Sequence, residues 1–173
     1  RTRLMTYGLS GVIIDFENIR DSDKGFAVRN FLNELRKILN PVTFVYEIVF
    51  ATPAVSYGKW VFPNILDYAD YLFIMGYDYY GNWSSTTGPS APLSGGFFNI
   101  TKSLNEDYST VPSNKLILGV PYYGNYWKTN SKEAYAKVTP FDSMKAPNNW
   151  VKPALHYKEI LSSYRQKEKL FDA

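Results

Sequence analysis

The sequence predicts an α/β fold with a parallel sheet, and two patterns support this. Short apolar runs alternate with segments of helical spacing along most of the 173 residues, as in strands joined by crossover helices. The runs are apolar at consecutive positions, which is typical of strands buried on both faces. Hydrophobic residues make up 45% and charged residues 20% of the chain, so we expect one ordered domain over residues 1–173.

The elements follow one another in a strand–helix rhythm. Strands are expected at about 12–17, 42–51, 71–78 and 115–123. Helices are expected at about 25–39, 60–69, 97–107 and 154–169. Asp21, Ser22 and Asp23 are candidate N-caps of the first helix, and Pro63 must lie in the first turn of the second. A Gly-, Ser-, Thr- and Pro-rich loop covers residues 79–96, and loops of that length are often functional.

Two carboxylates stand at the end of the first expected strand. Because strand side chains alternate, Ile13, Asp15 and Glu17 are expected on one face. Removing two carboxylates from water costs too much free energy for them to serve packing alone. We interpret them as the acid groups of a hydrolase.

Polar or aromatic residues also end the other three strands. They are Thr52 and Pro53, then Met75, Tyr77 and Asp78, and finally Tyr122 and Tyr123. Active sites of (β/α)8 barrels are assembled from the carboxyl ends of several strands. The sequence therefore predicts part of a TIM barrel, with four parallel strands and intervening helices.

A closed barrel of this type has eight strands in about 250 residues. We therefore expect either a piece of a longer protein or a half-barrel that pairs with another copy through its open edges. A monomer of this chain should expose an apolar edge at the first and fourth strands.

Three segments resemble motifs of glycoside hydrolase family 18, the chitinase family. Residues 10–17 (SGVIIDFE) resemble its Asp-Gly-x-Asp-x-Asp-x-Glu strand, residues 75–78 (MGYD) its Met-x-Tyr-Asp strand, and residues 118–124 (LGVPYYG) its Leu-Gly-Val-Pro-Phe-Tyr-Gly strand. Their order and spacing fit the fourth to seventh strands of that barrel. Ser10 and Ile13 replace two of the family's Asp residues, and Asn125 stands where chitinases often carry Arg.

The resemblance implies hydrolysis of β-1,4 bonds in N-acetylglucosamine polymers such as chitin, by the substrate-assisted retaining mechanism. It implies that Glu17 is the general acid, that Asp15 orients the acetamido N–H, and that the Tyr77 hydroxyl holds the acetamido oxygen. We expect Asp15 and Glu17 to point into one cavity, with Tyr77 within hydrogen-bonding reach. With half a barrel, we expect the isolated chain to have little activity.

Further residues are expected to bind the substrate. Asp78 is implied to bind the same sugar, and Met75 and Tyr123 are candidates for the wall of the site. Trp83 and Trp127 follow the third and fourth strands, and their rings are candidates for stacking on a pyranose.

Two alternatives remain open at this point. One is a peptidoglycan or N-glycan-core hydrolase of the same family, and the other is a non-catalytic chitinase-like carbohydrate-binding protein. No cofactor or metal is expected. A charge of +3 without a basic stripe argues against nucleic acid as a partner, and no apolar run is long enough to suggest a membrane partner. The family resemblance implies a secreted or cell-surface location.

Overall fold

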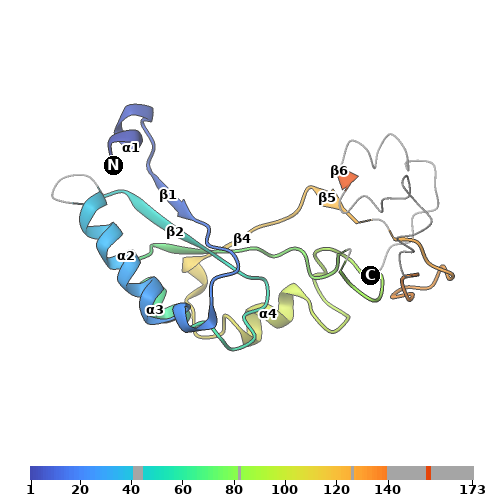
Figure 1. Ribbon diagram of the computed structural model, residues 1–173. Helices are drawn as coiled ribbons and strands as arrows, with labels where there is room; N and C mark the ends of the chain where they lie inside the picture. The colour runs from blue at the N-terminus through green and yellow to red at the C-terminus, as the bar shows by residue number, and fades with distance from the viewer. Residues whose placement is uncertain (41–44, 82, 126, 140–154, 157–173) are drawn as a thin grey trace. The chain divides into compact units, whose positions relative to one another are not determined.

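The computed structural model describes residues 1–40, 45–81, 83–125, 127–139 and 155–156, and the chain divides into two compact units (Figure 1). The first unit comprises Arg1–Met75 and Lys102–Gly119, and the second comprises Gly76–Thr101 and Val120–Ala173. A single domain over residues 1–173 stays a prediction.

A four-stranded parallel sheet forms the centre of the first unit and confirms the predicted fold class. Its strands lie in chain order, namely β1 (Gly11–Ile14), β2 (Glu47–Thr52), β3 (Tyr71–Ile74) and β4 (Leu116–Leu118). In the register, Ile14 pairs with Phe50 and Thr52 pairs with Ile74. Because all four strands run the same way, their carboxyl ends lie at one edge of the sheet, which we call the carboxyl edge.

Three of the predicted helices are present. The first is one residue shorter than expected, and the other two are shorter by several residues. They are α2 (Phe26–Leu39), α3 (Phe62–Leu66) and α4 (Ile100–Glu106). Pro63 lies in the first turn of α3, as expected. The helix α1 (Thr2–Tyr7) was not predicted.

The expected N-caps of α2 were wrong. The residue at its N-cap is Gly25, without a side-chain hydrogen bond. Residues Asp21–Asp23 instead form the 3-10 turn η1, and their carboxylates pair with basic side chains rather than with the helix backbone.

One face of the sheet packs against the helices and forms the core. Ile48, Phe50, Leu72 and Ile74 are at most 1% exposed, and they cluster with Leu32 of α2 and with residues of α3. Burying each such side chain contributes about 1.5–3 kcal/mol. This covered face holds the four strands in register.

The opposite face of the sheet is less covered, and here the expectation of burial on both faces was wrong. Ile13 of β1 is 62% exposed and Ile117 of β4 is 38% exposed. The register places Val49, Tyr71 and Phe73 on the same face by alternation, and all three are half-buried. Apolar side chains thus remain partly open to solvent on this face.

The fourth predicted strand, 115–123, is two strands in the structure. Gly119 N–H still donates to the Ile74 carbonyl at 2.8 Å, but Pro121 has no N–H with which to continue the ladder. The chain then forms β5 (Tyr123–Gly124), which pairs antiparallel with β6 (Leu155–His156). The helix predicted over 154–169 was therefore wrong at 155–156, and its other residues lie outside the described part of the chain.

Candidate active site

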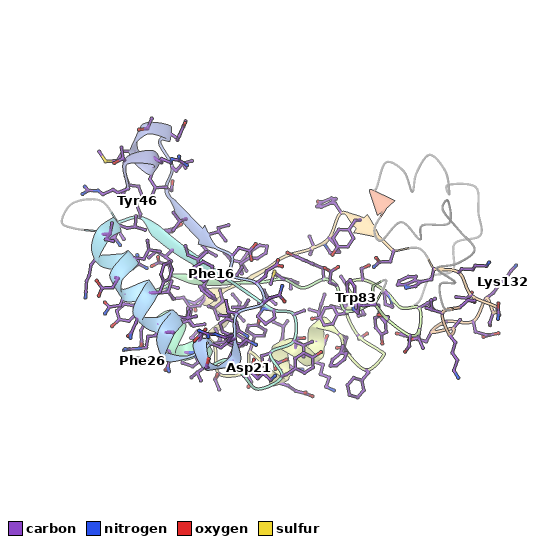
Figure 2. All side chains as sticks on the ribbon, in the orientation of Figure 1. Phe16, Asp21, Phe26, Tyr46, Trp83 and Lys132 are labelled. Atoms are coloured by element: carbon purple, nitrogen blue, oxygen red, sulfur yellow. The ribbon has the colours of Figure 1, made fainter. Side chains whose placement is uncertain are left out.

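The two candidate acids follow β1 directly. The strand ends at Ile14, three residues earlier than predicted. Asp15 and Glu17 are exposed beyond it, so the expectation that these two carboxylates are removed from water was wrong. Phe16 between them is anchored in the unit, with its ring centroid 5.1 Å from that of Phe31 and 6.4 Å from that of Phe50. The ring of Phe16, which is labelled in Figure 2, therefore packs against the first unit, whereas Asp15 and Glu17 are exposed.

The chain turns immediately after Glu17. Asn18 has a φ of 55°, the left-handed region that Asn tolerates better than most residues. Such conformations concentrate at functional sites because the surrounding structure must hold them in place. The chain then continues into η1, which begins at Asp21.

A cluster of ion pairs around Asp21 follows the turn at Asn18. The Asp21 carboxylate binds Lys24 Nζ at 2.7 Å and Lys59 Nζ at 2.8 Å. These two hydrogen-bonded ammonium groups lower the pKa of Asp21 to about 2. Lys59 comes from the loop after β2, so the cluster ties together the loops that follow β1 and β2.

Met75 lies at the same carboxyl edge. It follows β3 directly, is half-buried, and its N–H donates to the Thr52 carbonyl at 2.9 Å. The first unit therefore carries three predicted site residues, Asp15, Glu17 and Met75, at the ends of two parallel strands of one sheet.

In the second unit, three residues from two motifs lie together. The Tyr123 hydroxyl donates a hydrogen bond to Asp78 Oδ1, and the Tyr77 and Tyr123 rings meet edge to face with centroids 6.3 Å apart. Asp78 has a φ of 60°, so the second candidate segment also carries a left-handed residue. We call these three residues the Tyr–Asp–Tyr cluster.

The pKa of Tyr123 in this cluster is raised. Burial of the phenol is the main cause, because it disfavours the phenolate, and the hydrogen bond to the Asp78 carboxylate adds to it. Tyr123 thus remains a hydrogen-bond donor to Asp78 over the whole physiological range.

The two tryptophans differ in exposure. Trp83 is 64% exposed, whereas Trp127 is half-buried and its indole Nε1–H donates to the Gly81 carbonyl at 3.0 Å. The exposed ring of Trp83 can accept a sugar face as it stands.

Asn125 has a structural role that the sequence did not reveal. Its Nδ2 donates to the Tyr80 carbonyl at 2.9 Å and to Ser90 Oγ at 2.7 Å, so it fixes the long loop that follows Asp78. Sequence reasoning noted this residue only as a departure from Arg, and it missed Gly81, Asn18 and the ion pairs of Asp21.

Two other findings concern only the described ranges. They contain no group of three or more His, Cys, Asp or Glu side chains that could hold a metal ion. Their helices are all too short or too polar to cross a bilayer.

Comparison with known proteins decides the family. The family model described as "Glycosyl hydrolases family 18" matches residues 2–172. This chain belongs to that family. The resemblance of the three motifs is thereby confirmed.

Relatives of known sequence match most of this chain. A chitinase-like allergen of the mite Dermatophagoides farinae is 28% identical over 72% of the chain. A putative sporulation-specific glycosylase of Bacillus subtilis is 32% identical over 70% of it. The chain covers only 26% and 29% of these two proteins, respectively.

Solved structures confirm the barrel fold. A chitinase of Cycas revoluta, solved in complex with (GlcNAc)3, matches 98% of the chain with a TM-score of 0.80 and 20% identity. A group IV chitinase of Ostrinia furnacalis, solved with allosamidin, matches 96% with a TM-score of 0.79 and 24% identity. The chain spans 53% and 50% of these structures, so its four-stranded sheet is part of a TIM barrel.

Proposed function

We propose that this chain carries the catalytic acid of a family 18 hydrolase that cleaves β-1,4 bonds in N-acetylglucosamine polymers of the chitin type. The observation that carries the proposal is the exposure of Asp15 and Glu17 at the carboxyl edge of a parallel barrel sheet, where barrel enzymes place their catalytic groups. Membership of family 18 supports the same reaction class.

In this proposal the substrate supplies its own nucleophile. The Glu17 carboxylic acid gives its proton to the glycosidic oxygen, and the bond from that oxygen to the anomeric carbon breaks. The acetamido oxygen of the same sugar bonds to the anomeric carbon and forms an oxazolinium ion. Water then attacks that carbon, the bond from the carbon to the acetamido oxygen breaks and restores the neutral acetamido group, and the Glu17 carboxylate takes the proton released by the water.

The neighbouring groups stabilise the charge that develops. Asp15 accepts a hydrogen bond from the acetamido N–H and offsets the positive charge of the oxazolinium ring, and the Tyr77 hydroxyl donates to the acetamido oxygen. That Tyr77 lies within reach of the two carboxylates stays a prediction.

Further contacts are proposed for the remaining candidates. Asp78, held by Tyr123, binds hydroxyl groups of the same sugar, and Met75 forms part of the wall. The rings of Trp83 and Trp127 contact neighbouring sugars through their apolar faces.

The test compares Glu17→Gln with Glu34→Gln in the protein that carries this chain. Glu34 is an exposed glutamate on α2 that pairs with the exposed Lys37 at 2.6 Å, so the same chemical change there should leave activity intact. Glu17→Gln should abolish nearly all release of chitooligosaccharides and retain binding, because it removes the proton and keeps the shape. Full activity in Glu17→Gln would overturn the assignment.

The choice of polymer is tested with a substrate panel. Chitooligosaccharides, muropeptides and N-glycan cores all contain the 2-acetamido group that the mechanism requires. Turnover of muropeptides or N-glycan cores, without turnover of chitooligosaccharides, would favour a peptidoglycan or N-glycan-core hydrolase of the same family. Binding without turnover of any of the three would favour a carbohydrate-binding protein without activity.

We also infer that the outer strands of the sheet associate with further strands. In the described residues, β1 and β4 each have one edge without a strand partner, and unpaired edges invite association. If β4 of each of two copies paired with β1 of the other copy, the two sheets would together form a ring of eight strands. Sedimentation of the 173-residue chain tests this, and a monomer at all concentrations would exclude self-association.

A secreted or cell-surface location is proposed on the family resemblance alone. Fractionation of producing cells tests it, and recovery only from the cytoplasmic fraction would contradict it.

A further inference from the structure

The indole of Trp83 lies directly on the backbone of a buried glycine. A Cβ built on Gly81 would come within 2.3, 2.4 and 2.5 Å of three ring carbons of Trp83, far inside van der Waals contact. These three atoms belong to the six-membered ring, so the large end of the indole covers the Gly81 Cα. No L-residue fits at position 81 unless the ring moves.

The polar backbone groups of Gly81 are all occupied. Its carbonyl accepts hydrogen bonds from Ser84 N–H at 2.9 Å and from Trp127 Nε1–H at 3.0 Å. Its N–H donates to Ser84 Oγ at 3.1 Å. Gly81 is therefore fixed from three directions, and Trp127 braces it from a different part of the chain.

Trp83 nevertheless remains 64% exposed. A large aromatic side chain that is both exposed and seated offers an apolar face to a ligand while its other surface rests on a rigid support. Pyranose rings have apolar faces that stack on such rings. Because the support already restricts the indole, less conformational entropy is lost when a ligand binds than for a freely rotating side chain.

We propose that Gly81 is a positioning residue that seats Trp83 as a preorganised platform for one sugar ring of the substrate, with Trp127 as its brace. This inference rests on the proposed function for the identity of the ligand. The seat itself is a property of the fold and can be tested without any sugar.

The first test follows the Trp83 indole in the protein without ligand. Its indole N–H resonance, assigned by its loss in Trp83→Phe, should show the restricted motion of a packed side chain. In Gly81→Ala, this resonance should show that the Trp83 indole has become mobile. The resonance of Trp60, which packs in the first unit, should stay unchanged. If the Trp83 indole is already mobile in the wild type, or is equally restricted in Gly81→Ala, Gly81 does not position it and the proposal is wrong.

The second test measures affinity for chitotetraose in a double-mutant cycle. Gly81→Ala alone should weaken binding about tenfold, the scale of losing one well-placed aromatic contact, and should raise KM more than it lowers kcat. In the Trp83→Ala background, Gly81→Ala should cost no further affinity, because the platform is already gone. An equal loss in both backgrounds would show that Gly81 acts through something other than Trp83.

If Gly81→Ala fails to fold, the more conservative variant Trp127→Phe tests the same contact. Trp127→Phe removes the Nε1–H donor and keeps an aromatic ring, and it should loosen the Trp83 indole in part. If the seat is observed but no variant, wild type included, binds chitotetraose, the proposed function fails and the seat stands. If chitotetraose binds tightly and Trp83→Ala has no effect on affinity, the platform role fails and the proposed function stands.

Discussion

The Tyr123 hydroxyl donates a hydrogen bond to the Asp78 carboxylate, joining residues that are 45 positions apart in the sequence. Each of them belongs to a different one of the motifs that predicted the family. The pair therefore shows, within the second unit, that two motifs converge on one point. The hydrogen bond also orients the Asp78 carboxylate, although Asp78 is exposed and its backbone is in the left-handed region.

Tyr123→Phe should reduce stability in a pH-dependent way. The pKa of Tyr123 is raised above its ordinary value of 10.0, so the folded protein holds this proton more tightly than the unfolded chain. The stabilisation is complete below about pH 10 and is lost as pH rises above it, because the unfolded chain ionises first. Urea unfolding at pH about 8 and about 11 should show the gap between wild type and variant narrowing as pH rises. A gap that stays constant would mean that the phenol ionises normally.

Asn18 provides a test of the turn behind Glu17. At a φ of 55°, an L-residue with a Cβ is strained by about 1–2 kcal/mol unless its side chain compensates. Asn18→Gly should therefore retain stability and activity, whereas Asn18→Ala should be about 1 kcal/mol less stable than Asn18→Gly. Thermal or urea unfolding measures the difference. Equal stability of the two variants would show that the turn relaxes at no cost.

The regular part of the fold could be predicted because its signals are local. The apolar runs that became β2 and β3, and the apolar positions Val28, Leu32 and Leu39 that α2 buries, are visible in short windows of sequence. The pairing of β5 with β6 was not visible, because two-residue strands separated by thirty positions leave no periodicity. The exposure of Ile13 also escaped prediction, since an apolar run does not reveal which sheet face the rest of the fold covers.

The site was predicted in part for a different reason. Asp15, Glu17, Tyr77 and Asp78 were named because they follow apolar runs, and the family motifs then assigned their roles. Their positions just after β1 and β3 follow from the topology. The seat of Trp83 on Gly81 depends on a close approach between a ring and a backbone. Such an approach has no signature in composition or spacing, so the glycine could not be singled out.

Arg36 should be a major determinant of the first unit's stability. From α2 it donates to the Tyr46 carbonyl at 2.9 Å and to the Tyr68 carbonyl at 2.5 and 2.9 Å, and it pairs with Asp70 Oδ2 at 2.7 Å. Asp70 Oδ2 also accepts the Ile48 N–H at 2.7 Å, so the cluster links α2 to the start of β2. Arg36→Met should cost about 2–4 kcal/mol, because it leaves the partly buried Asp70 carboxylate without its cation.

Urea unfolding measures this cost, and Arg36→Lys is the matched control. Lysine keeps the positive charge but lacks the planar fork of donors that reaches three acceptors at once. Its stability should lie between those of wild type and Arg36→Met. A loss below about 0.5 kcal/mol for Arg36→Met would place the cluster among ordinary surface contacts.

Asp21→Asn should test whether the ion-pair cluster holds the loop behind Glu17. The pKa of Asp21 is lowered to about 2 from 3.8 by Lys24 and Lys59, so its contribution to stability is present above pH about 4 and is lost as pH falls through about 2. The variant should show faster hydrogen exchange than wild type at the amides of η1 at pH about 6, and the two proteins should converge as the carboxylate protonates. Asp23→Asn, which removes the charge that pairs with Arg20 and can still accept the Ser22 hydroxyl, is the control and should leave the Lys59 contact intact. Equal exchange in wild type and Asp21→Asn at pH about 6 would show that the ion pairs of Asp21 do not hold this loop.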